Sequence, residues 1–62
     1  MKIYRIIYFN TTLKRRCTKF MQGKSYAEAS KPFSNIILGQ EIDNEGKVVR
    51  TEYRSEAHKE TK

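Results

Sequence analysis

The sequence predicts a small α+β domain in which an antiparallel sheet of two hairpins carries one short helix on one face, in the order ββαββ. Four runs rich in β-branched and aromatic residues are separated by turn-forming residues. Between the second and third runs, Ser25 and Glu28 have the spacing of a helix-capping pair. The chain has 62 residues, enough for one domain, which we assign to residues 1–54.

The first run, residues 1–10, predicts a strand with two apolar faces. One face carries Tyr4, Ile6 and Tyr8, and the other carries Ile3, Ile7 and Phe9, interrupted by Arg5. Strands that are apolar on both sides are typical of the middle of a sheet. We therefore expect this strand to have a neighbour on each side.

The second run, residues 13–22, alternates apolar and basic residues and predicts the return strand of a first hairpin. A two-residue turn would place Arg5 opposite Arg16, and directly opposed like charges are destabilising. A longer loop would remove this clash by changing the register. The pattern alone leaves the register open.

A short helix is expected to begin at Tyr26, because Ser25 and Glu28 form a capping box. Pro32 disfavours helical geometry at Lys31, so we expect about two turns ending near that residue. The alternative is a kinked helix that continues to Leu38.

The second hairpin is predicted from residues 35–43 and 47–53, with a turn at 43–46 in which Gly46 takes left-handed geometry. Alternation predicts one face with Ile36, Leu38 and Ile42, and one face of the return strand with Val49, Thr51 and Tyr53. Gly39 marks a candidate bulge. Residues 55–62 are polar and predict a disordered tail.

Charge is distributed unevenly along the chain. The net charge is +6, and residues 1–31 contain eight Lys or Arg against one Glu. This asymmetry suggests an anionic partner, such as nucleic acid or an acidic surface of a host protein complex. An alternative explanation is that the cations protect an edge strand against aggregation.

The first hairpin is the predicted binding surface, because a strand would hold its cations at fixed spacing beside aromatic rings. The expected partner-binding residues are Lys14, Arg15, Arg16, Lys19, Arg5, Lys24, Tyr4 and Tyr8. The aromatic residues could instead belong to the core or to a dimer interface, and a homodimer is a further expectation.

Catalysis is not expected. His58, the one histidine, falls in the predicted tail, and Cys17, the one cysteine, is better suited to a small buried apolar role. The acidic residues near the second turn do not match a calcium-binding loop. We therefore expect no catalytic residue, metal, cofactor or small-molecule substrate. No stretch is long enough to cross a bilayer, so we expect no membrane partner and a cytoplasmic location.

The short chain opening MKIYRIIYF, the capped segment GKSYAEA and the polar tail resemble small accessory proteins of bacteriophages and prophages. The resemblance is one of size and style, and it assigns no site residue. It implies host-takeover or anti-defence roles, in which case the location would be the host cytoplasm. The expected function is a non-enzymatic protein whose basic first hairpin engages nucleic acid or a nucleic-acid-handling complex. The alternative is a protein-binding inhibitor of a host or defence protein, acting as a homodimer.

Overall fold

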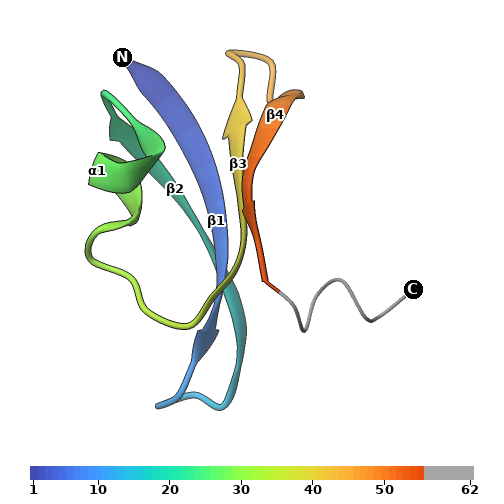
Figure 1. The fold of residues 1–62 in the computed structure, drawn as a ribbon. Helices are drawn as coiled ribbons and strands as arrows, with labels where there is room; N and C mark the ends of the chain where they lie inside the picture. The colour runs from blue at the N-terminus through green and yellow to red at the C-terminus, as the bar shows by residue number, and fades with distance from the viewer. Residues whose placement is uncertain (56–62) are drawn as a thin grey trace.

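A computed structural model describes residues 1–55, and residues 56–62 of the predicted tail, with His58, lie outside the described part. The elements are, in order, β1 (Lys2–Asn10), β2 (Arg15–Gly23), α1 (Tyr26–Ser30), β3 (Ile36–Ile42) and β4 (Val48–Arg54). The strands form one antiparallel sheet in the order β2-β1-β3-β4, and α1 lies against one side of it (Figure 1). The prediction of an antiparallel sheet with one short helix is confirmed.

Strand β1 lies in the middle of the sheet, as its two apolar faces predicted. It pairs with β2 over nine consecutive residues without a register shift. The loop between them spans residues 11–14, so the two-residue turn is wrong and the longer loop is present. Arg5 consequently lies opposite Phe20, and the clash between Arg5 and Arg16 does not arise.

Helix α1 begins at Tyr26 with Ser25 as its N-cap, as predicted. The Glu28 backbone N–H donates to Ser25 Oγ at 3.3 Å. The reciprocal bond differs from the expected capping box, because Glu28 Oε1 accepts from the Lys24 N–H at 2.9 Å rather than from Ser25. The helix ends at Ser30 with Lys31 as its C-cap, so the continuous helix to Leu38 does not form.

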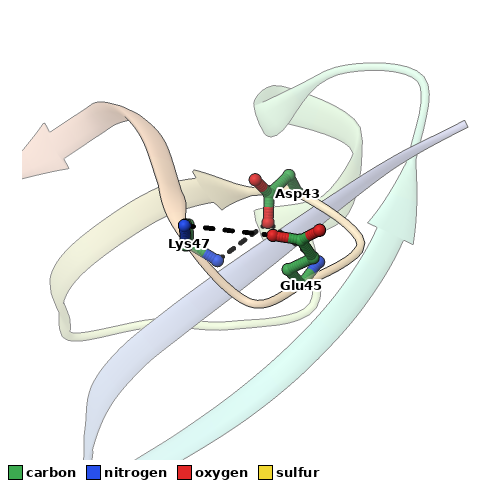
Figure 2. Close-up of polar contacts among 3 residues, drawn as sticks. All are labelled: Asp43, Glu45 and Lys47. Carbon is green, nitrogen blue, oxygen red and sulfur yellow. Dashed lines mark hydrogen bonds and ion pairs between the residues drawn. The ribbon is translucent and has the colours of Figure 1, made fainter.

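The turn between β3 and β4 has the predicted geometry, with Gly46 at φ 85°. Its N–H donates to the Asp43 carbonyl at 3.0 Å. The Asp43 carboxylate also accepts the N–H of Glu45 and of Lys47, each at 2.9 Å, and the Lys47 ammonium lies 3.9 Å from Glu45 (Figure 2). The acidic residues of this turn thus organise its backbone.

Three irregularities in pairing change which residues share a face. Between Ile7 and Tyr8 the register with β3 shifts, so Leu38 lies opposite Ile7 but Ile36 lies opposite Tyr8. The predicted single face of Ile36, Leu38 and Ile42 is therefore wrong for Ile36, which packs against the core on the other side of the sheet.

The two remaining shifts lie between β3 and β4, and one of them falls next to Gly39, although the extra, unpaired residue is Glu52 of β4 rather than the predicted Gly39. Tyr53 lies opposite Gly39, whereas Thr51 lies opposite Gln40. Opposed residues share a face, so the predicted common face of Thr51 and Tyr53 is wrong. A bulge inserts one unpaired residue and resets the alternation after it.

The sheet therefore has two distinct sides. The helix face, which α1 covers in part, carries Tyr4, Ile6, Tyr8, Arg15, Cys17, Lys19, Met21, Ile36, Gly39, Glu41, Arg50 and Tyr53. The open face carries Ile3, Arg5, Ile7, Phe9, Arg16, Thr18, Phe20, Gln22, Leu38, Gln40, Ile42, Val48, Thr51 and Arg54.

The main core lies between α1 and the helix face. Tyr4, Ile6 and Ala29 are almost completely buried there. The Tyr26 ring meets Tyr4 edge to face, with centroids 5.9 Å apart. The same ring covers Gly39, where a side-chain carbon would lie 2.6 Å from Tyr26 Cζ. A residue without a side chain is therefore required under this ring.

Two tyrosines of this core make stability sensitive to alkaline pH. Burial, followed by the negative charges of Glu41 and Glu52, raises the pKa of Tyr4 above its ordinary value of 10.0. Burial likewise raises the pKa of Tyr26. The folded state then holds its phenolic protons more tightly than the unfolded state.

We therefore expect the free energy of unfolding to be unaffected by these groups below about pH 10 and to fall as the pH rises above it. Chemical denaturation at about pH 9 and about pH 11 measures this loss. Tyr4→Phe, which removes one ionisable hydroxyl, should lose less stability over the same interval. An equal loss in Tyr4→Phe would contradict the assignment to Tyr4.

Candidate nucleic-acid interface

Three basic residues of the first hairpin lie together at its tip. The Asn10 carboxamide oxygen accepts the N–H groups of Thr12 and Leu13, both at 3.0 Å, and the Lys14 N–H bonds to the Asn10 carbonyl. Lys14 adopts φ 59° in this loop, so its prediction as a strand residue is wrong. Asn10 thereby brings Lys14 next to Arg15 and Arg16, and all three cations are exposed.

Strand β2 directs its cations to both sides of the sheet, as predicted. Arg15 and Lys19 lie opposite Asn10 and Ile6 and therefore on the helix face, whereas Arg16 lies opposite Phe9 on the open face. Both Arg15 and Lys19 are exposed, because α1 covers only part of the helix face. Arg16 is the cation of the tip that faces the uncovered side.

Arg5 is the second cation of the open face within β1 and β2. It is half-buried, and its Nη2 donates to the Gln40 side-chain oxygen. Gln40 in turn donates to Thr51 Oγ1 at 3.3 Å. Arg5 is thus held in place by Gln40 of β3, which is itself bonded to Thr51 of β4. These contacts orient the Arg5 charge and reduce the entropy lost when a ligand binds.

Lys24 does not join this group of cations. It follows the end of β2, whereas Lys14 precedes its start, and the nine residues of the strand separate them by roughly 30 Å. The Lys24 backbone is tied to Glu28 at the start of α1. The predicted single patch is therefore corrected to a tip cluster of Lys14, Arg15 and Arg16, with Lys24 remote from it.

The two aromatic residues predicted for the site, Tyr4 and Tyr8, do not lie on the open face. Tyr4 is 1% exposed and cannot stack on a ligand. Tyr8 is half-buried on the helix face, where its ring centroid lies 5.0 Å from that of Phe33. Both rings stabilise the core, since a strand with two apolar faces turns one of them toward the helix.

Phe9 and Phe20 are the aromatic rings that the open face exposes, at 40% and 62%. Phe20 was not among the predicted site residues, and it lies opposite Arg5 on the side of the sheet away from Tyr4 and Tyr8. Alternation already places Phe20 on the same side of its strand as Arg16, which the two-residue-turn register sets opposite Arg5, and this was the signal that could have found it. Phe20 therefore lies beside Arg5 on the surface that also carries Arg16.

The carboxylates of the sheet lie away from this surface. Within residues 1–55, no acidic residue belongs to the open face, which carries Arg5, Arg16 and Arg54. On the helix face, Glu41 and Glu52 lie 3.5 Å and 3.8 Å from Arg50 Nε. The open face therefore combines uncompensated positive charge with exposed aromatic rings.

Other chemistries find less support in the described part of the chain. Cys17 is a half-buried free thiol on the helix face. Residues 1–55 contain no group of three or more potential ligands placed to hold a metal ion. The same residues include no helix with the length and apolar character needed to span a bilayer. Comparison with known proteins finds no matching family, curated sequence or solved structure.

Proposed function

We propose that this chain is a non-enzymatic protein that binds single-stranded nucleic acid through the open face of its first hairpin. The observation that carries the proposal is Phe20, which is 62% exposed on the open face of the edge strand β2, directly opposite Arg5 and on the same face as Arg16. A large exposed ring on a surface without carboxylates suits a ligand that offers both flat bases and negative charge.

The tip cluster supplies the electrostatic part of this binding. Lys14, Arg15 and Arg16 are consecutive and exposed, so they can contact neighbouring phosphates along a strand. Each phosphate neutralised releases counterions, which makes the affinity depend on salt. The binding should therefore be strong at low salt and should weaken steadily as salt is added.

The exposed rings supply the preference for single strands. A base stacked on an aromatic side chain contributes roughly 1–3 kcal/mol, and this contact requires a base that is free of its duplex neighbours. Phe20 and Phe9 lie on adjacent strands of the open face and offer two such platforms. A duplex could reach the cations but not these rings.

The test is to reverse the charge of the tip cluster in Arg15→Glu/Arg16→Glu. Affinity for single-stranded DNA and RNA and for duplexes is measured from 50 to 300 mM salt. Losing two phosphate contacts should weaken single-strand binding roughly tenfold or more at low salt and reduce the salt slope by roughly 1.4. The control is Lys31→Glu/Lys47→Glu, which changes the net charge equally at exposed positions outside the first hairpin.

Absence of binding at low salt, or equal affinity in the tip variant and its control, would contradict the proposal and favour edge protection as the role of the cations. A second candidate is a protein-binding inhibitor of a host or defence protein. It draws support from Val48, an exposed aliphatic side chain of the open face opposite Ile42. A stoichiometric complex that survives nuclease treatment would favour this candidate.

A further inference from the structure

Strand β2 is an edge of the sheet with an unusually regular backbone. It has β1 as its single neighbour and pairs with it over nine residues without a bulge. The other edge, β4, contains two register shifts within seven residues. Bulges hinder the addition of a further strand, and a long regular edge favours it.

The free hydrogen-bonding groups of β2 can be assigned from one backbone hydrogen bond of its neighbour. The Phe9 N–H donates to the Asn35 carbonyl at 3.0 Å, on the β3 side of β1. Because direction alternates along an antiparallel strand, Tyr8 and Ile6 bond to β2 through their partners Cys17 and Lys19. The residues of β2 that direct their N–H and C=O groups away from the sheet are Arg16, Thr18, Phe20 and Gln22.

The side chains of β2 are self-complementary about Thr18. If a second β2 pairs antiparallel with Thr18 opposite Thr18, then Arg16 faces Phe20 of the other copy on the open face, twice. A guanidinium next to an aromatic ring is a favourable pairing. On the helix face, Lys19 faces Cys17 and Arg15 faces Met21. No cation lies directly opposite another cation in this arrangement.

The neighbouring registers are less favourable. Pairing centred on Lys19 places two ammonium groups directly opposite each other, and pairing centred on Cys17 opposes Arg15 with Lys19. Pairing centred on Phe20 uses Gly23, at the end of β2 where the helix packs, since a side-chain carbon at Gly23 would lie 3.3 Å from Ala29. The register centred on Thr18 stays away from this end.

We propose that two copies of this chain dimerise by antiparallel pairing of β2 with β2 about Thr18. Three pairs of outward-directed residues then exchange two hydrogen bonds each, and the two four-stranded sheets become one continuous sheet. The two open faces become contiguous, with the Arg16 and Phe20 pairs at their centre. This deepens the proposed function, because one nucleic-acid strand could then contact both platforms.

Salt separates dimerisation from nucleic-acid binding. The two β2 strands bring six cations together, so dimerisation in the absence of nucleic acid should strengthen as salt screens their repulsion. Nucleic-acid binding should weaken over the same range. Because the dimer is measured without nucleic acid, its absence would leave the proposed function intact, and a failure of oligonucleotide binding would leave the dimer intact.

The experiment combines sedimentation with cross-linking. Thr18→Pro removes an outward N–H that β1 does not use, and proline is tolerated on edge strands, so the variant should fold but remain monomeric. In a Cys17→Ser background, Thr18→Cys should form a disulfide dimer on mild oxidation, since paired Cα atoms lie about 5.5 Å apart. Phe20→Cys in the same background is the control, because its two copies would lie roughly 13 Å apart along the strands.

A wild-type dimer at raised salt, a monomeric Thr18→Pro protein and cross-linking at residue 18 support the proposal. A wild-type protein that is monomeric at every salt and protein concentration overturns it. Dimerisation that persists in Thr18→Pro, or cross-linking at residue 20 in preference to residue 18, also overturns it. The cross-linking result decides the question if Thr18→Pro does not fold.

Discussion

Replacing Gly39 with alanine is expected to lower the free energy of unfolding by about 2–3 kcal/mol, because the added methyl group would overlap the Tyr26 ring. The new carbon would lie 2.5 Å from the Tyr26 hydroxyl oxygen and 2.6 Å from Tyr26 Cζ. The ring would have to leave its place over β3, and its edge-to-face contact with Tyr4 would be lost.

Thermal and denaturant unfolding measure this effect, which should lower the melting temperature by roughly 10–20 °C in a domain of this size. The control is Gly46→Ala. Gly46 has φ 85°, and no atom lies within 4 Å of the position that an added side-chain carbon would take. Its replacement therefore carries backbone strain of about 1 kcal/mol without a clash. If Gly39→Ala costs no more than Gly46→Ala, the steric explanation is wrong.

A double-mutant cycle with Tyr26→Ala identifies the clashing group. Once the ring is absent, the additional cost of Gly39→Ala should largely disappear, because no other side chain is among the nearest atoms at this position. An undiminished cost would place the strain in the backbone around Gly39 instead. The cycle therefore separates side-chain packing from backbone geometry at one residue.

Phe20→Ala is expected to weaken binding of single-stranded nucleic acid by roughly 1–3 kcal/mol, which is roughly 5- to 150-fold, and to change the stability of the protein little. Phe20 is 62% exposed, so truncation removes little buried area from the fold. Its loss removes the aromatic platform opposite Arg5, whereas the tip cations remain. Duplex binding should change much less.

Tyr8→Ala is the matched aromatic comparison on the same hairpin. Tyr8 packs against Phe33 on the helix face, so its truncation should lower stability while leaving the open face intact. Oligonucleotide titrations measure the affinity of each variant for nucleic acid, and denaturation curves measure the free energy of unfolding of each. Weakened binding in folded Tyr8→Ala, with unchanged binding in Phe20→Ala, would contradict the proposal, because the binding site would then lie on the helix face and not on the open face.

Local sequence determined the individual elements of this protein. The two apolar faces of residues 2–10 predicted a central strand, and β1 has a neighbour on each side. Ser25 and Pro32 bracketed the helix, which runs from Tyr26 to Ser30. Gly46 predicted the second turn. Each of these features depends on the conformations that neighbouring residues permit, so a short stretch of sequence contains the required information.

The tertiary structure alone decided which residues share a face. The register shifts opposite Tyr8 and beside Gly39 moved Ile36 and Tyr53 to the side opposite the one that alternation indicated. A bulge depends on the packing of the partner strand, and strict alternation cannot reveal it. The sequence therefore predicted the positions of the helix and the strands more accurately than it predicted which residues share a face of the sheet.

The first hairpin likewise combines features that local sequence predicted with features that depend on tertiary packing. Sequence identified Arg15, Arg16 and Lys19 as cations held by a strand, and β2 presents them on both sides of the sheet. It predicted Tyr8 as a binding residue and missed Phe20, because the position of α1 decides which side of the sheet is buried. The composition of a strand is local, whereas the burial of one face depends on where distant segments pack.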